Sequence, residues 1–161
     1  VDLQLTGVDA CTLAGEVATL VSPEAARRNI QIALDCEPEA VMMEADPDLI
    51  KQAVLNVVMN AVEAMKNGGR LGIGVKRVGS DCVFHVSDQG GGIPAPVRDK
   101  IFNLYFTTKE RGSGIGLAMT FRVVQMHNGS IDFASELGKG TTFWLRLPAP
   151  ESAIRPAPEK V

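Results

Sequence analysis

The sequence lacks the marks of several protein classes. Its three cysteines form no CxxC pair, which argues against a zinc site or a disulfide framework and favours reduced thiols in the cytoplasm. No apolar run approaches the roughly 20 residues of a membrane helix, and no basic-then-apolar leader opens the chain. A basic surplus is also missing. The net charge is −3 at pH 7, which argues against a general nucleic-acid binder.

The composition that is present is that of one globular domain. The chain has 161 residues, 45% of them hydrophobic and 22% charged. A chain of this length buries a core without help from a metal or a disulfide. We expect the domain to span residues 1–148 and the proline-rich residues 149–161 to be disordered. Because the first residue is Val1 instead of methionine, we also expect the chain to be a piece of a longer protein.

Apolar periodicity predicts helices alternating with short strands. Asp46 is a good N-cap and Pro47 suits a first helical turn, so we expect a helix from there to about residue 66. Further helices are expected over residues 8–29, with Pro23 interrupting the ladder, and over residues 114–127. The expected strands are residues 30–34, 40–43, 71–78, 82–86, 130–134 and 141–147. This pattern favours an α/β two-layer sandwich with helices on one face of the sheet.

The helix from residue 47 carries an unusual polar face. Asn56 and Asn60 are one helical turn apart and share a face, which Glu63 and Ala64 extend. Asparagine is a mediocre helix former, so a pair of them requires partners. A ligand is one such partner; solvent or nearby backbone is an equally good one. The opposite side is expected to face the core and carries Leu55, Val58, Met59 and Val62.

Two glycine-rich segments are candidates for close contact with a ligand. Asp88 follows an apolar strand and precedes Gly90, Gly91 and Gly92, where backbone can approach a flat ligand or simply turn. The second segment opens a helix, where free N–H groups suit phosphate, and reads Gly112, Ser113, Gly114, Ile115, Gly116 and Leu117. The dinucleotide fingerprint does not fit this segment, and the Walker A spacing does not fit the region around residues 138–139.

A segment with aromatic anchors lies between the two glycine clusters. Phe102, Tyr105 and Phe106 fall within five residues and are expected to anchor a mobile loop. Lys109 and Arg111 follow beside the second glycine cluster, where they suit phosphate as countercharges, although a lone loop lysine is commonly just solvated.

The four segments together resemble the ATP-binding catalytic domain of sensor histidine kinases, in the GHKL superfamily. The resemblance rests on their order along the chain: N-x-x-x-N-A, D-x-G-x-G-I-P, I-F-x-x-x-F-T-T-K and G-S-G-I-G-L. It extends over residues 46–148 and is closest to the nitrogen-regulation type of two-component kinase. It implies the GHKL ATP-binding fold, in which a mixed sheet of about five strands is covered on one face by about three helices.

The resemblance also implies a role for each matching residue. Asn60 would coordinate Mg²⁺, Asp88 would accept a hydrogen bond from the adenine amino group, and Thr141 would order the adenine side. Residues 103–113 would form a lid, and Lys109 or Arg111 would contact phosphate. The implied catalytic residues are Asn56, Asn60 and Lys109. The implied ATP-binding residues are Asn60, Glu63, Ala64, Asp88, Gly90, Gly92, Ile93, Thr107, Thr108, Lys109, Arg111, Gly112, Ser113, Gly114, Ile115, Gly116, Leu117 and Thr141.

Two positions depart from patterns within the superfamily. Asn56 stands where the ATPase branches carry a water-activating glutamate, and an amide cannot serve as a general base. Slow hydrolysis is therefore expected, with the γ-phosphate kept for transfer. Glu63 stands where many histidine kinases carry a phosphate-binding lysine, which shifts that role to Lys109.

The two histidines, His85 and His127, lie in contexts unlike a phosphoacceptor hairpin, so both are expected to be structural. The resemblance then implies a cytoplasmic, ATP-dependent protein-histidine kinase domain that uses ATP and Mg²⁺. Its phosphoacceptor histidine would lie on a separate helical dimerisation and phosphotransfer domain, with a response regulator downstream and no nucleic-acid or membrane contact by this segment. The alternatives are a GHKL-type serine kinase and a nucleotide-gated interaction module without transferase activity.

Overall fold

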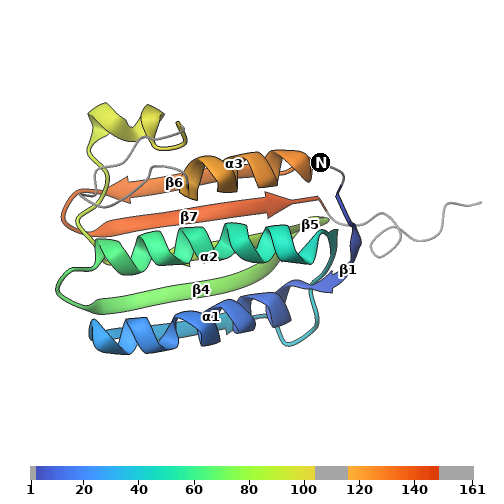
Figure 1. Ribbon diagram of the computed structural model, residues 1–161, viewed down its shortest axis with the longest axis horizontal. Coiled ribbons are helices and arrows are strands. Elements are labelled where there is room, and N and C mark those ends of the chain that lie inside the picture. The colour runs from blue at the N-terminus through green and yellow to red at the C-terminus, as the bar shows by residue number, and fades with distance from the viewer. Residues whose placement is uncertain (1–2, 104–115, 149–161) are drawn as a thin grey trace, which may run out of the picture.

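The computed structural model describes residues 3–103 and 116–148. Within this part of the chain, three helices lie over one face of a five-stranded sheet (Figure 1). The expected two-layer α/β sandwich with a mixed sheet is therefore confirmed. The elements in chain order are β1 Thr6–Asp9, α1 Ala10–Arg27, β2 Ile30–Cys36, β3 Met42–Ala45, α2 Pro47–Ala64, β4 Gly69–Val78, β5 Asp81–Ser87, a 3-10 helix Ala95–Lys100, α3 Gly116–Met126, β6 Ser130–Glu136 and β7 Gly140–Leu147.

The order of strands in the main sheet is β2-β4-β5-β7-β6. β2 runs parallel to β4, and the other neighbours are antiparallel. Ser87, at the end of β5, pairs with Thr142 near the start of β7. This register brings the residue after β5 beside the turn between β6 and β7, although more than 50 residues separate them in sequence.

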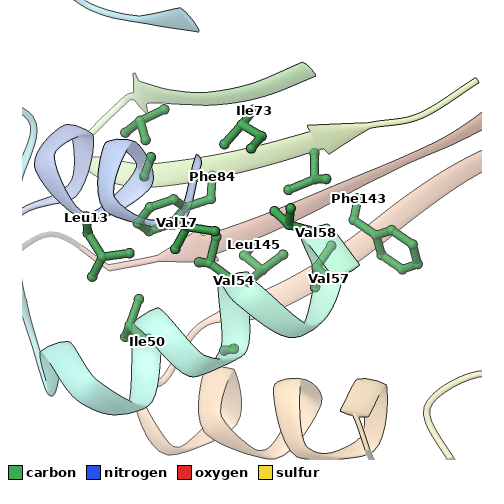
Figure 2. Close-up of a cluster of buried hydrophobic side chains, with 14 of the residues drawn as sticks. Leu13, Val17, Ile50, Val54, Val57, Val58, Ile73, Phe84, Phe143 and Leu145 are labelled. Carbon is green, nitrogen blue, oxygen red and sulfur yellow. The ribbon is translucent and has the colours of Figure 1, made fainter. Parts of the chain in front are cut away.

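The core lies between α2 and the sheet. Figure 2 shows Val54, Val57 and Val58 of α2 on the side of the helix that faces Phe84 and Leu145. Burying a side chain of this size contributes about 1.5–3 kcal/mol, so this stripe fixes how α2 is rotated on the sheet. The buried residues of α2 are Ile50, Ala53, Val54, Val57, Val58, Ala61 and Val62.

Two of the expected core positions are only partly buried. Val58 and Val62 lie in the core as expected, but Leu55 and Met59 pack at its margin. The face of α2 that is buried runs through Val54, Val57 and Ala61, so Leu55 and Met59 lie at its edge. Asn56 and Asn60 are half-buried, beside the core instead of diametrically opposite it.

The N-terminal region differs from the sequence expectation. Residues 6–9 form β1, which pairs with β3 in a separate two-stranded sheet, so the helix predicted from residue 8 begins only at Ala10. Asp9 ends the strand and caps the helix, because its Oδ1 accepts a hydrogen bond from the Cys11 backbone N at 3.1 Å. Pro23 lies inside α1 without ending it. The 3-10 helix was not predicted, and the predicted disorder of residues 149–161 lies outside the described residues.

Asp46 joins three parts of the chain at the start of α2. Its Oδ1 accepts from the Leu49 backbone N at 3.3 Å, as the cap prediction required, and its Oδ2 accepts from the Gln4 backbone N at 3.0 Å. The hydrogen bond from Gln4 is the main cause that holds the pKa of Asp46 below its ordinary value, and the bond from Leu49 adds to it. The Asp46 backbone N donates to Nε2 of buried His127 at 3.0 Å, and Nδ1 of that ring contacts the Val123 carbonyl at 2.8 Å.

Replacing His127 should therefore destabilise the fold. His127→Ala leaves the buried Asp46 N–H without an acceptor, which costs about 1–3 kcal/mol before any loss of packing. Urea unfolding followed by circular dichroism measures this loss. His127→Gln retains a side-chain acceptor and should lose less. Equal losses for the two variants would show that the hydrogen bond to Asp46 contributes nothing.

Candidate functional site

Asp88 lies at the centre of the candidate site, directly after β5. Its backbone N donates to the Thr141 carbonyl at 2.8 Å. Its Oδ1 accepts from the Gly90 backbone N at 2.8 Å and from the Thr141 backbone N at 3.2 Å. Within the described part of the chain, Oδ2 has no hydrogen-bond partner. One carboxylate oxygen is therefore anchored, and the other can accept a hydrogen bond from a ligand.

The surroundings of Asp88 change the pKa of its carboxyl group. Burial raises the pKa of Asp88 above the ordinary aspartate value, and the hydrogen bonds from Gly90 and Thr141 oppose that change. The carboxylate is thus a partly desolvated acceptor. Such an acceptor makes a stronger hydrogen bond than an exposed one, and the bond is sensitive to protonation at a higher pH.

A chain of hydroxyl contacts holds the wall beside Asp88. The Ser135 Oγ lies 2.8 Å from the Thr141 Oγ1 and accepts from the Ile93 backbone N at 2.6 Å. Arg98 donates to the Ile93 carbonyl at 3.0 Å and to the Ser135 carbonyl at 2.6 Å. Ser135 and Arg98 were missed from the sequence, because a serine in a strand and an arginine in an irregular segment carry no local signal of these contacts.

The glycines near Asp88 are required by close packing. An added Cβ on Gly90 would lie 2.7 Å from the Ala64 carbonyl oxygen, and one on Gly92, which has φ +83°, would lie 2.6 Å from the Glu136 carbonyl oxygen. At Gly140, a Cβ would lie 2.0 Å from the Asp88 carbonyl oxygen. These glycines bring the loop after β5 against the end of α2 and the β6–β7 turn. That the backbone at these glycines approaches a flat ligand remains a prediction.

The polar face of α2 contacts the start of α3. Asn56 donates through Nδ2 to the Gly116 carbonyl at 3.3 Å and accepts through Oδ1 from Gln52 at 3.1 Å. Buried Thr120 donates to the Gly116 carbonyl at 3.0 Å and is also placed to donate to the Ala53 carbonyl at 3.2 Å. Asn56 of the asparagine pair therefore has a backbone partner, which links α2 to the first described turn of α3. Leu117, in the same turn, packs against the core.

A cavity of about 780 Å³ opens at the end of α2. This volume is in the range of small-molecule sites. It brings together four residues of the predicted set, Glu63, Ala64, Gly90 and Gly92, from α2 and from the loop after β5. Gly91, from the same predicted glycine segment, also lines it. The other lining residues were not predicted: Met65, Lys66, Asn67, Gly68, Gln89 and Gly138.

The remaining predicted residues lie partly inside and partly outside the ranges that the structure describes. Phe102 is an anchor as expected, with its ring centroid 5.3 Å from Phe121, 6.1 Å from Phe133 and 6.3 Å from Phe143. In residues 3–103 and 116–148 no three His, Cys, Asp or Glu side chains gather as a metal cluster. The predicted residues outside the described ranges are Tyr105, Phe106, Thr107, Thr108, Lys109, Arg111, Gly112, Ser113, Gly114 and Ile115.

Comparison with known families agrees with this geometry. Residues 45–151 match the family model described as histidine kinase-, DNA gyrase B- and HSP90-like ATPase. The sensor histidine kinase ZraS of Escherichia coli strain K12 is 40% identical over 146 residues. That alignment covers 91% of this chain and 31% of ZraS, so the chain spans about a third of this relative.

Solved structures share both fold and sequence with the chain. The catalytic domain of the histidine kinase ThkA, nucleotide-free, superposes with a TM-score of 0.83 at 30% identity, covering 91% of this chain and 96% of that domain. Full-length ShkA in complex with AMPPNP superposes with a TM-score of 0.85 at 31% identity, covering 92% of this chain and 32% of ShkA.

Two neighbouring glycine variants test the close packing around Gly90. Gly90→Ala would force a methyl group against the Ala64 backbone and should lower both the free energy of unfolding and the midpoint temperature. Gly91→Ala should be nearly neutral, since nothing lies within 4 Å of its Cβ position. Differential scanning calorimetry compares the two. Equal effects would contradict close packing at Gly90.

Proposed function

Because the chain belongs to the histidine kinase-, DNA gyrase B- and HSP90-like ATPase family, we propose that it is the ATP-binding catalytic domain of a sensor histidine kinase. It binds Mg·ATP and transfers the γ-phosphoryl group to a histidine on a separate domain. The observation that carries the proposal is Asp88, with Oδ1 held by Gly90 and Thr141 and Oδ2 left for a ligand.

Recognition of adenine follows from this carboxylate. An exocyclic amine is a donor and suits Oδ2, whereas the carbonyl at the same place in guanine would face a second acceptor. A hydrogen bond to a charged group contributes about 1.5–3 kcal/mol, or roughly ten- to a hundredfold in affinity. Asp88 therefore selects ATP over GTP, and Thr141 and Ser135 hold it in place.

The metal role is assigned to Asn60 on α2. An amide oxygen is a hard ligand that suits Mg²⁺, and the absence of an acidic cluster among the described residues fits an ion bound largely through substrate phosphates. When bound, the ion would supply charge neutralisation on the phosphates. Lys109 or Arg111 supplies the remaining cation, and the glycines from Gly112 to Gly116 supply backbone donors.

Transfer is favoured over hydrolysis by Asn56. Its amide cannot abstract a proton from water, and its two polar groups already contact Gly116 and Gln52. Phosphoryl transfer needs mainly positioning and charge neutralisation, so this domain requires no nucleophile of its own. Asn56 instead links α2 to the Gly116 carbonyl, at the end of the proposed phosphate-binding segment.

The phosphoacceptor lies on another domain. His127 is buried with both ring nitrogens in contacts, and His85 lies in a strand, where its ring fills the space over Gly74. Neither is presented on an exposed helix. The partners are a helical dimerisation and phosphotransfer domain and, downstream, a response regulator. ThkA has been crystallised with the response regulator TrrA.

The site of action is the cytoplasm, where ATP is abundant. None of the helices in residues 3–103 and 116–148 is long and apolar enough to cross a bilayer.

Asp88 should give nucleotide binding a characteristic pH dependence. Because burial raises the pKa of Asp88, affinity for adenosine should fall with decreasing pH earlier than an ordinary aspartate would allow. Adenosine is the ligand of choice because it has no phosphate to titrate. Asp88→Asn should lower affinity roughly ten- to a hundredfold and flatten the pH profile. Exposed Asp132→Asn is the control. An unchanged profile in Asp88→Asn, measured by NMR titration, would contradict the assignment.

Asn60→Ala should weaken ATP binding in Mg²⁺ far more than in EDTA, because the side chain acts through the metal. Isothermal titration calorimetry in the two buffers measures the difference. The control is Gln52→Ala, two turns earlier on the same face of α2. Any loss of ATP affinity in this variant should be the same in Mg²⁺ and in EDTA. Equal losses for Asn60→Ala in both buffers would make Asn60 structural.

The chain should label a partner and not itself. Incubated with γ-labelled ATP, it should transfer acid-labile, base-stable phosphate to a separate helical hairpin bearing its acceptor histidine. The rate should be low, because the effective concentration supplied by covalent linkage is missing. Label on this chain alone would refute the assignment. Acid-stable label would favour a serine kinase, brisk hydrolysis would favour an ATPase, and binding without transfer would favour an interaction module.

A further inference from the structure

Two cysteines that are far apart in sequence face each other across α1 and β2. Cys11 lies in the first turn of α1, and Cys36 is the last residue of β2, the strand at the edge of the sheet (Figure 1). An added Cβ on Gly15 would lie 3.9 Å from Cδ2 of Leu34. One helical turn back from Gly15 covers about 6 Å, and two residues onward from Leu34 cover about 6.6 Å. Since α1 and β2 are consecutive and antiparallel, these steps arrive together at Cys11 and Cys36.

The two thiols lie near each other and are partly accessible. The Cys11 thiol is close enough to Cys36 to contribute to the raised pKa of the Cys36 thiol. Both residues pack at the margin of the core and are only partly buried. Cys82, the third cysteine, is fully buried in β5. All three are free thiols in this structure.

We propose that Cys11 and Cys36 form a reversible disulfide when the protein meets a low-molecular-weight dialkyl disulfide, the class that includes oxidised glutathione. The bond closes a loop of roughly 25 residues that contains α1 and most of β2, and it ties the first helical turn to the edge of the sheet.

The chemistry proceeds in two exchange steps. The Cys11 thiolate attacks one sulfur of the oxidised reagent, which expels one small thiolate and leaves a mixed disulfide. The Cys36 thiolate then attacks the Cys11 sulfur and expels the second small thiolate. The protein loses two electrons and two protons, and the reagent takes them up as two small thiols. Burial, followed by the nearby Cys11 thiol, raises the pKa of Cys36 to about 12, so Cys36 acts second, where proximity compensates for its low thiolate fraction.

The pair lies away from the candidate site. Cys36 pairs with Val75 of β4, whereas Ser87, next to Asp88, pairs with Gly72, three residues earlier on β4 and on the opposite side of that strand. The disulfide therefore locks the end of the domain where β1 meets α1 and leaves the surroundings of Asp88 unchanged. Oxidation should raise the midpoint temperature without changing nucleotide affinity.

Peptide mapping of the full chain tests the proposal. After incubation with oxidised glutathione at pH 8 and acid quenching, trypsin separates the cysteines into peptides 1–27, 29–51 and 78–98. We expect a cross-link between the first two peptides, a midpoint temperature several degrees higher, and full reversal by dithiothreitol. A persistent glutathione adduct, three free thiols or a cross-link to peptide 78–98 would overturn the proposal.

Three variants complete the test. Cys82→Ser should oxidise like the parent chain. Cys36→Ser should stop at the mixed disulfide on Cys11 and gain no thermal stability from oxidation. Cys11→Ser gives the same comparison from the helix side if Cys36→Ser folds poorly, and it too should gain no stability. A stability gain in either of these single variants would contradict the assigned pair.

Discussion

The junction between β5 and β7 is the constraint on which the site depends. The Asp88 backbone donates to the Thr141 carbonyl while its Oδ1 accepts from the Thr141 backbone, so strand pairing itself orients the carboxylate. The approach is so close that only glycine fits at position 140, where a Cβ would meet the Asp88 carbonyl oxygen at 2.0 Å. A carboxylate anchored in this way loses little conformational entropy when a ligand binds its free oxygen.

The other half of the site depends on how α2 divides its surface. Valines such as Val54 and Val58 bury one stripe against the sheet, which leaves Asn56 and Asn60 at the edge of the contact. Asn56 links α2 to α3, because its side chain donates a hydrogen bond to the Gly116 carbonyl. One helix thus bears on both the proposed metal position at Asn60 and the proposed phosphate-binding segment, while the buried contact from Asp46 to His127 holds its first turn.

Local signals in the sequence predicted most elements and the residues that the fold gathers around Asp88. The Asp46 cap, the helix stops and the glycines around Asp88 act within a few residues, so they can be read without the fold. Contacts between distant residues could not be predicted in this way. Ser135 and Arg98 gain their roles only from strand register, and β1 exists only because β3 passes beside it. The proximity of Cys11 and Cys36 likewise requires the packing of α1 on β2.

We propose that one carboxylate oxygen of Asp88 recognises adenine while the protein backbone holds the other. A crystal structure of this chain with Mg²⁺ and a non-hydrolysable ATP analogue tests it most directly. The adenine amino nitrogen should lie within hydrogen-bond distance of Oδ2, with Oδ1 still bound by the Gly90 and Thr141 backbone. An adenine bound away from Asp88, or a nucleotide that displaces the Thr141 contact, would contradict it.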